Sequence, residues 1–162
     1  FEGRIQGQAV RSSADLARKL PIQLINSSTF DLLEGGPRVR RQFLDWGVFH
    51  VEQGFHQLWI DVHRCLRQRN SLLRHARIPA DQLQAWSLRL AAAATQLDLL
   101  RHRYFEAFLP VFRRTLGELT DIEGLELGYL RGWDKGRELF QVLDDQFERD
   151  RDRGFTLSLI HI

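Results

Sequence analysis

The sequence predicts an α+β, predominantly helical fold in which an antiparallel helical hairpin is inserted between two segments of β character. Three observations predict this fold. Apolar residues recur at alternating spacings of three and four in two stretches, 55–76 and 83–111. A short turn containing Pro79 separates the two stretches. Segments in which polar and apolar residues alternate lie on both sides of them, as expected for strands.

Composition limits the class of protein. The chain has 162 residues, of which 43% are hydrophobic and 27% charged, so it suits one globular domain and is neither a disordered tail nor a membrane protein. The pI is about 9.1 and the positive charge is nearly all arginine, because only Lys19 and Lys135 are lysines. This mild basicity permits a nucleic-acid partner without requiring one. Cys65 is the lone cysteine, which excludes an internal disulfide and favours a cytoplasmic protein.

The first part of the chain is predicted to be β structure with a short helix. Residues 1–10 indicate a hairpin that turns near Gln6 and Gly7. Ser13 is the expected N-cap of a helix over residues 14–20, which ends before a proline. Residues 21–25 are predicted to form a buried strand, followed by a polar loop at residues 26–28.

Long helices are predicted from Pro37 onward. Gly35 and Gly36 break the chain, Pro37 suits the first residue of a helix, and Gly54 marks the next break. The two heptad helices that follow bury their apolar stripes only if they fold back on each other. Pro110 is expected to kink the second helix or to mark a junction within it.

The chain is then predicted to return to β structure. Residues 122–129 are strand-like and residues 132–136 form a turn. An amphipathic helix begins near Leu139, ends at Gly154, and is followed by a strand that starts at residues 155–156.

Six segments resemble, in sequence and in order, one protein family. They are residues 21–25, 32–37, 40–50, 66–70, 131–133 and 147–151. The block from residue 35 to residue 50 is the longest and is specific enough to exclude a chance match. Through these segments, nearly all of residues 1–156 is similar to the RecF family of DNA-repair ATPases.

The resemblance implies a two-lobed parent protein with a Rad50-like ABC ATPase head and an inserted helical arm. Residues 1–36 would belong to a head subdomain, residues 37–121 to the arm and residues 122–156 to the return into the head. Such a parent binds ATP and Mg²⁺, forms an ATP-dependent homodimer and engages gapped or junction DNA. With recombination mediator proteins it promotes recombinase loading in the SOS response. It would be a slow DNA-dependent ATPase with no membrane partner.

The chain departs from the family pattern in several places. It lacks the phosphate-binding Gly-x-x-x-x-Gly-Lys-Ser/Thr loop, which the family carries before the equivalent of Phe1. The ABC signature and the Walker B acids follow the equivalent of Thr156, so we expect no catalytic residue, bound cofactor or ATPase activity in this chain alone. Residues 157–162 replace the family's Ser-Gly-Pro-His continuation, and we expect them to be a non-native tail.

The loop after the first predicted strand is a candidate nucleotide contact. Asn26, Ser27 and Ser28 occupy the position where the resemblance places the loop that senses the γ-phosphate, with Gln23 as a weaker candidate. Ser27 and Ser28 stand where family members usually carry a Pro-Glu pair. The alternative is an ordinary capped turn.

Two groups of arginines are candidate DNA contacts. Arg38, Arg40 and Arg41 begin a helix, where a phosphate is favoured. Arg64, Arg67, Arg69 and Arg74 recur along the first hairpin helix.

Each group has a structural alternative. For any one of the first three arginines, pairing within the chain with Glu34 or Asp45 is slightly favoured over a DNA contact, and a run like the second group is usually a solvated face. The heptad frame places Arg69 on the buried seam, where Asp98 or Glu106 is the expected partner.

No metal site is expected, because Glu52, His56 and His63 match no metal-binding spacing. The tryptophans and Cys65 are interpreted as core residues. The alternative function, from a different class, is a non-catalytic helical-hairpin module for protein–protein contact.

Overall fold

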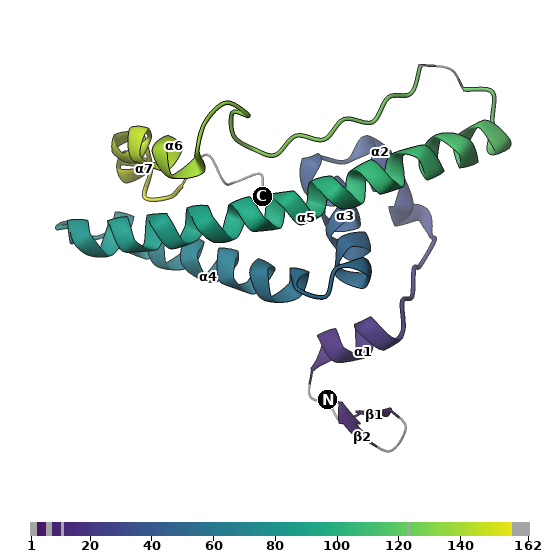
Figure 1. The fold of residues 1–162 in the computed structure, drawn as a ribbon, viewed down its shortest axis with the longest axis horizontal. Coiled ribbons are helices and arrows are strands. Elements are labelled where there is room, and N and C mark those ends of the chain that lie inside the picture. Colours follow the sequence, from purple (N-terminus) through teal and green to yellow (C-terminus); the bar gives the residue numbers. More distant parts are fainter. Residues whose placement is uncertain (1–2, 6–7, 11, 123, 157–162) are drawn as a thin grey trace. The chain divides into compact units, whose positions relative to one another are not determined.

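A computed structural model of the chain describes residues 3–5, 8–10, 12–122 and 124–156. The chain divides into two compact units, Phe1–Val51 and Glu52–Ile162 (Figure 1). The predicted tail, residues 157–162, lies outside the described residues. No helix among the described residues is both long and apolar enough to cross a bilayer.

The first unit begins with the predicted hairpin. Strands β1 (Gly3–Ile5) and β2 (Gln8–Val10) pair antiparallel, with Arg4 opposite Ala9. The predicted turn residues lie outside the described part of the chain. Helix α1 (Ser13–Lys19) follows, and its N-cap is Ser12, one residue before the predicted cap. The hydroxyl of Ser12 accepts a hydrogen bond from the Asp15 amide at 3.1 Å.

The predicted buried strand at residues 21–25 is wrong. These residues have no regular secondary structure, and Leu24 and Ile25 are 75% and 84% exposed. Within the described residues β1 and β2 form the whole sheet, so this segment has no strand with which to pair its backbone. A 3₁₀ helix, η1 (Ser27–Phe30), and a short helix, α2 (Asp31–Glu34), come next.

Helix α3 (Pro37–Val51) begins at Pro37 as predicted. Val48 is its buried residue. The rings of Trp46 and His50 meet edge to face with centroids 4.3 Å apart, and the Arg18 guanidinium of α1 lies 5.4 Å from the centroid of the Phe49 ring. The cation–π contact therefore connects α1 with α3 inside the first unit, whereas the aromatic contact lies within α3.

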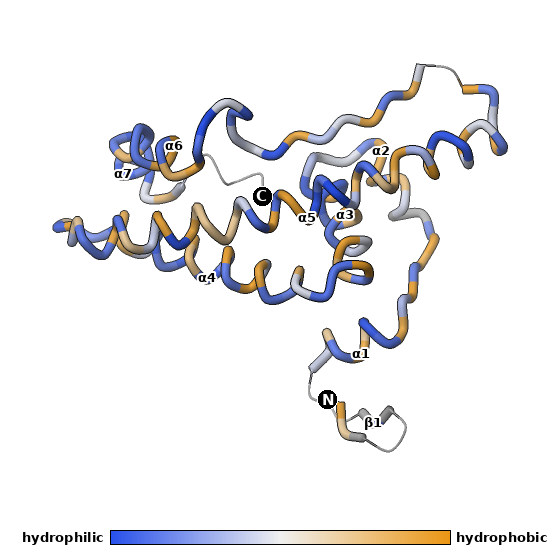
Figure 2. The backbone as a smooth tube through the Cα atoms, in the orientation of Figure 1, coloured by the Kyte–Doolittle hydropathy of each residue, from blue (hydrophilic) through white to orange (hydrophobic). Residues whose placement is uncertain are grey.

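The second unit is built on the predicted helical hairpin. Helices α4 (Phe55–Leu73) and α5 (Ala80–Leu119) run antiparallel and are joined by a short turn that ends at Pro79 (Figure 1). Figure 2 shows hydrophobic and hydrophilic positions alternating along both helices. Pro110 lies inside α5 without ending it. The shared core comprises Phe55, Val62, Cys65, Leu73, Leu90, Ala91, Ala94 and Leu97.

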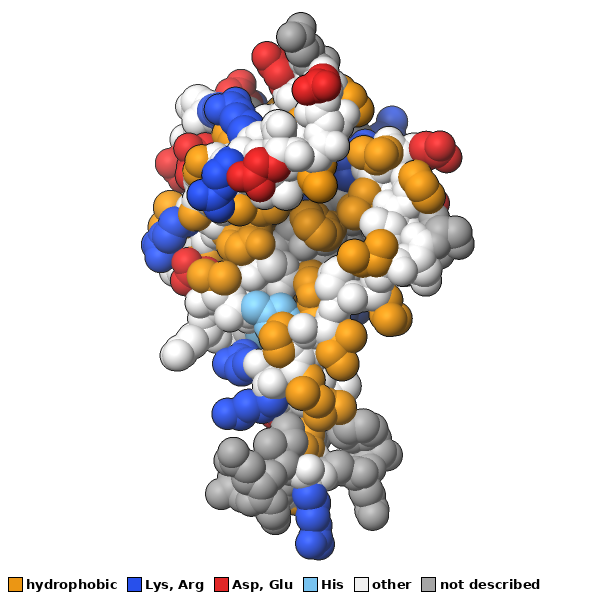
Figure 3. Space-filling view, turned by 90° about the vertical axis from the view of Figure 1, so that its right-hand side faces the viewer, with side chains coloured by type: hydrophobic (Ala, Val, Ile, Leu, Met, Phe, Trp, Pro, Cys, Tyr) orange, Lys and Arg blue, Asp and Glu red, His pale blue; other side chains and the backbone are white. Residues whose placement is uncertain are grey.

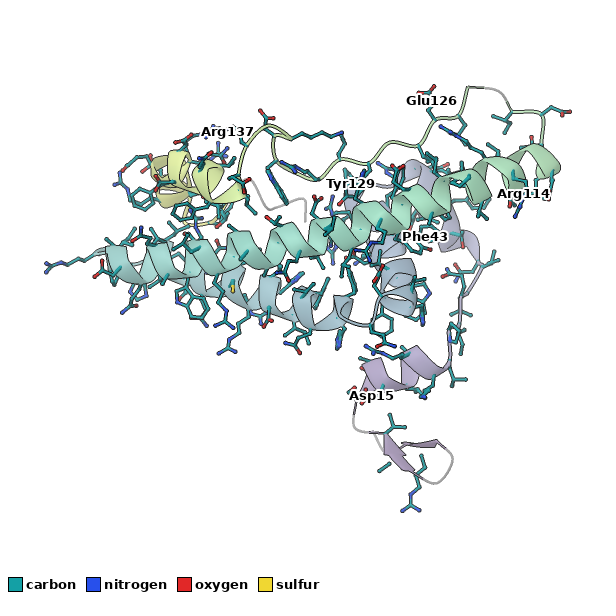
Figure 4. All side chains as sticks on the ribbon, in the orientation of Figure 1. Asp15, Phe43, Arg114, Glu126, Tyr129 and Arg137 are labelled. Carbon is teal, nitrogen blue, oxygen red and sulfur yellow. The ribbon has the colours of Figure 1, made fainter. Side chains whose placement is uncertain are left out.

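After α5 the chain runs back along that helix without forming the predicted strand (Figure 1). Residues 120–122 and 124–138 are irregular. Tyr129, labelled in Figure 4, holds this segment on α5. Its hydroxyl donates to the Asp98 carboxylate at 2.7 Å, and its ring centroid lies 5.7 Å from the ring centroid of Phe105. The segment is therefore held by side chains on a helix, and its backbone joins no sheet within the described residues.

Two short helices replace the single helix predicted after residue 138. They are α6 (Leu139–Asp145) and α7 (Phe147–Arg153), separated at Gln146. Leu139 and Leu143 of α6 are buried. Gly154 ends α7, as predicted, and has the left-handed conformation with φ 73°. Residues 155 and 156, where a strand was predicted to start, have no strand structure, and the residues after them lie outside the described part of the chain.

Candidate nucleic-acid interface

One side of α4 carries exposed arginines. Arg64 and Arg67 are exposed, and so is Arg74, which is the C-cap of the helix. Spacings of three and seven residues bring these side chains to neighbouring positions on a helix surface. The acidic residue of α4 is Asp61. This α4 arginine face therefore has an excess of positive charge and presents guanidinium groups suited to phosphate oxygens.

The arginine face continues into the turn between the two helices. His75 and Arg77 are exposed there, next to Arg74. Arg74 also has a structural contact, because its Nε donates to the carbonyl of Gly154 at 3.2 Å. The turn end of the hairpin is therefore basic and is tied to the residue that follows α7.

Arg69 is on the buried seam, as predicted, but its partner is neither of the two expected residues. Its guanidinium is 1% exposed, and Nη1 pairs at 2.7 Å with the Asp150 carboxylate of α7, which is fully buried. Nε donates to Ser87 Oγ at 3.0 Å and Nη2 to the carbonyl of Leu143 at 3.2 Å. Nη1 also donates to the hydroxyl of Thr156.

The antiparallel register explains why the expected partners are wrong. Arg69 lies near the hairpin turn, so it meets Ser87 near the start of α5. Asp98 lies eleven residues further along α5, about 16 Å away at the rise of an α-helix. Its carboxylate accepts the Tyr129 hydroxyl instead, and Glu106 is more distant and exposed.

Asn70 adds a second link to the same segment. Its side-chain oxygen accepts hydrogen bonds from the Thr156 amide at 2.8 Å and from the Thr156 hydroxyl at 2.7 Å. We call Arg69, Asn70, Ser87, Asp150 and Thr156 the Arg69 clamp. The clamp fixes residues 139–156 on the turn end of the hairpin. Its guanidinium is enclosed by protein, so Arg69 does not reach a DNA phosphate in this conformation, contrary to its predicted role.

Sequence reasoning missed most of the Arg69 clamp. The one available signal was an arginine on an apolar stripe, which requires a buried acceptor. The identity of that acceptor depends on how α7 docks, and helical periodicity within α4 and α5 does not contain this information.

The arginines at the start of α3 differ in their surroundings. Arg40 donates through Nη1 to the carbonyls of Gly35 at 2.8 Å and Leu32 at 3.2 Å, so it holds the end of α2. Arg38 is exposed, and Arg41 is half-buried. Arg38 is therefore the residue of this group that is most open to a phosphate, and a DNA contact by all three stays a prediction.

The candidate nucleotide loop forms a hydrogen-bonded turn. The Asn26 amide donates to Thr29 Oγ1 at 3.1 Å, and the Asn26 carbonyl accepts the Thr29 amide at 2.9 Å. Gln23 is exposed and donates to the neighbouring Leu24 carbonyl at 3.4 Å. Ser27 and Ser28 begin η1, and their side chains lie outside the described atoms. Nucleotide binding by these residues stays a prediction.

The residues considered for a metal have other contacts. Glu52 pairs with Arg103 at 3.3 Å, and the His63 ring stacks on Trp59 with centroids 3.8 Å apart. Among the described residues no three histidine, cysteine or acidic side chains gather in one place. Cys65 is fully buried, and this burial raises the pKa of its thiol, an effect that the nearby Arg89 opposes.

Comparison of the sequence with known proteins shows which proteins the chain is similar to. No family model matches the chain. It is 53% identical over 156 residues to the DNA replication and repair protein RecF of Pseudomonas fluorescens strain Pf-5, covering 96% of the chain and 42% of that protein. The RecF proteins of Pseudomonas entomophila strain L48 and Stutzerimonas stutzeri strain A1501 are also 53% identical, over 156 and 155 residues, with the same coverage.

The chain thus spans about 42% of the length of the curated relatives that it matches. The match includes both hairpin helices and the segment that the Arg69 clamp holds. Over the aligned residues, the chain belongs to the RecF family of DNA replication and repair proteins.

Proposed function

We propose that the chain acts in DNA repair and contacts the phosphate backbone of DNA through the α4 arginine face. The observation that carries this proposal is the set of exposed arginines Arg64, Arg67 and Arg74 on a helix with a single acidic residue. The Arg69 clamp supports it, because its hydrogen bonds hold the backbone that carries these arginines, so that backbone needs little further ordering when DNA binds. The names of the relatives support the repair role.

The wider activity that we propose belongs to a longer protein. In it, the residues matching this chain would serve an ATP- and Mg²⁺-dependent homodimer that binds gapped or junction DNA and, with mediator proteins, promotes recombinase loading. Asn26 and its neighbours would approach the nucleotide in that protein. RecF-family membership and the position of this loop in the sequence support these proposals.

Phosphate contacts of this kind carry a defined signature. Each arginine that neutralises a backbone phosphate steepens the dependence of log affinity on log salt by about 0.9, and base sequence has little influence. The binding is therefore expected to weaken sharply as salt rises and to differ little between DNA sequences of the same form.

A matched pair of double variants tests the role of α4. Fluorescence anisotropy with a gapped duplex should show that Arg64→Gln/Arg67→Gln lowers the affinity at low salt by about tenfold or more and flattens the salt dependence by about two units. Arg113→Gln/Arg114→Gln removes the same charge from exposed positions of α5 and should have little effect. An equal loss of affinity in both variants would show that binding depends on net charge alone, and it would reject a specific DNA contact by the α4 arginine face.

A second candidate function is protein–protein contact by the hairpin, which the exposed apolar side chains of α5 favour. Leu99, Val111 and Leu119 are exposed, and Figure 3 shows many hydrophobic side chains on the surface in that view. Sedimentation of the chain against the Val111→Glu variant tests it directly. Concentration-dependent association that the variant abolishes supports contact through this surface, and a monomer at all concentrations argues against self-association.

A further inference from the structure

The loop between Tyr129 and α6 lines a polar cavity that is partly open to solvent. The cavity measures about 200 Å³, and its lining includes Thr95 of α5, Gln141 of α6 and the loop residues Arg131, Lys135, Arg137 and Glu138. Figure 4 labels Arg137, which lies just before α6. The lining contains three cationic side chains and one carboxylate, so the cavity has a net positive charge at neutral pH.

Arg131 organises the loop from within. Its Nη2 donates to the carbonyls of Asp134 at 2.7 Å and Arg137 at 3.2 Å, and its Nε donates to the carbonyl of Trp133 at 3.4 Å. The guanidinium also lies 4.8 Å from the centroid of the Trp133 ring. These bonds use Nε and Nη2, so none of them involves Nη1.

The acidic residues of the loop neutralise this charge only in part. The Asp134 carboxylate accepts the amide of Gly136 at 2.8 Å and so closes a turn. Arg137 pairs with the exposed carboxylate of Asp145. Within the described part of the chain, no carboxylate lies within ion-pair distance of Arg131 or Lys135. Two of the three cations therefore lack a counter-ion from the protein.

We propose that this cavity, lined by Arg131, Lys135 and Arg137, binds a phosphate group. A tetrahedral dianion or a phosphodiester accepts hydrogen bonds from several directions, which suits two guanidinium groups, an ammonium group, the Thr95 hydroxyl and the Gln141 amide. The cavity volume of about 200 Å³ is several times the roughly 30 Å³ that one water occupies in the liquid, so there is room for one phosphate group.

The site is separate from the α4 arginine face and does not depend on it. Its residues come from α5, the loop and α6, whereas the proposed DNA contact uses α4 and the hairpin turn. The phosphate can come from a DNA backbone or from a free nucleotide or inorganic phosphate, since the local chemistry is the same.

The chain contains an internal control for a test, because Lys135 and Lys19 are its only lysines. Both are exposed. We would measure the acetylation rate of each by mass spectrometry after brief treatment with an amine-reactive acetyl ester, alone and with duplex DNA, ATP or inorganic phosphate. At a ligand concentration about ten times Kd, Lys135 should react roughly tenfold more slowly, while Lys19 should be unchanged.

The three ligands distinguish the possible sources of the bound phosphate group. Protection of Lys135 by DNA but not by the small anions identifies a backbone phosphate, and protection by ATP or inorganic phosphate alone identifies a free one. Protection by all three identifies a general phosphate site. If no ligand slows Lys135, or if Lys19 slows equally, the proposal is overturned. DNA that binds by anisotropy without protecting Lys135 would reject this site and leave the α4 proposal intact.

A second pair of variants tests whether the protection of Lys135 from acetylation depends on the cavity. Arg137→Gln removes a cation from the lining together with an exposed ion pair. Arg103→Gln makes the same change in charge and also removes an exposed ion pair, but on α5 and away from the cavity. Protection of Lys135 should fall several-fold in the first variant only. Equal protection in both would show that Lys135 is shielded by something other than an occupied cavity.

Discussion

The two halves of α5 follow the same heptad pattern but differ in what covers them. In the first half, Leu90, Ala94 and Leu97 are almost completely buried. Beyond Arg101 no residue of α5 is buried, and Val111, which continues the heptad stripe, is 49% exposed. A heptad repeat therefore predicts which face of a helix is apolar, but not whether a partner covers it.

The lengths of the two helices explain the difference. Helix α4 has 19 residues and α5 has 40, which correspond to about 28 Å and 60 Å at the rise of an α-helix. Helix α4 can cover only about half of its partner. The covered half near the turn is also held by the Arg69 clamp, whereas Tyr129 makes its contacts with Asp98, His102 and Phe105, further along α5.

Breaking the Arg69 clamp should produce the largest loss of stability. Asp150→Ala leaves the buried guanidinium of Arg69 without its counter-ion, which typically costs about 3–5 kcal/mol. Urea unfolding monitored by circular dichroism measures this loss. Glu52→Ala is the matched control, because it removes the carboxylate of the more exposed pair with Arg103 and should cost less than about 1 kcal/mol.

A double variant distinguishes a buried charge from a structural requirement. Arg69→Met/Asp150→Leu replaces both members of the pair with apolar side chains and should recover most of the stability that Asp150→Ala loses. A double variant as unstable as the single one would mean that the hydrogen bonds of Arg69 to Ser87 and Leu143 contribute more than its charge pairing.

Core truncations should separate the two halves of α5 directly. Leu97→Ala empties a fully buried position and should lower the free energy of unfolding by about 2–5 kcal/mol. Val111→Ala, at an exposed position of the same heptad frame, should cost less than about 1 kcal/mol. Similar losses would show that the far half of α5 is covered in solution.

A glycine substitution tests the end of α7 on a smaller scale. Gly154 has φ 73°, and Gly154→Ala should cost about 1–2 kcal/mol because an L-residue is disfavoured there. The added Cβ would also lie 3.3 Å from Cγ of Arg74, a flexible side chain that can move. Gly128→Ala is the control, since a Cβ there meets no atom within 4 Å, and thermal unfolding should show almost no change.

The smallest expected effect is a dependence on alkaline pH. The pKa of Cys65 is raised above its ordinary value of 9.0 in the folded chain, so the unfolded chain loses this proton at lower pH than the folded chain does. Stability should therefore be unaffected by this group below about pH 9 and should fall as the pH rises above it. Unfolding free energies measured from pH 7 to pH 10 should fall less steeply for Cys65→Ala, and identical slopes would contradict a buried thiol.

The sequence alone predicted the long helices and the first hairpin, but the strands that it predicted at residues 21–25 and 122–129 are absent. Pro37, Gly54 and Pro79 set helix boundaries through local backbone chemistry, so those boundaries could be read directly. A strand requires a partner that local sequence does not identify, and residues 21–25 and 122–129 find none among the described residues.

The candidate site was predictable to the same limited extent. Heptad spacing placed Arg69 on the buried seam and left Arg64 and Arg67 outside it, as observed. The choice of Asp150 over Asp98 depends on the docking of α7, a tertiary contact with no signature in the hairpin itself. The cavity around Arg131 could not be foreseen either, because the hydrogen bonds that shape its loop run to backbone carbonyls.

The Arg69 clamp also sets an order for the folding of the chain during its synthesis. Arg69 and Asp150 are 81 residues apart in the chain, and Thr156 is 87 residues from Arg69. At a translation rate of about 5–20 residues per second, the guanidinium waits roughly 4–16 s for its carboxylate to be made. The nascent hairpin must therefore tolerate an unpaired, hydrated arginine on its apolar seam, and the Arg69 clamp can form only after α7 has left the ribosome.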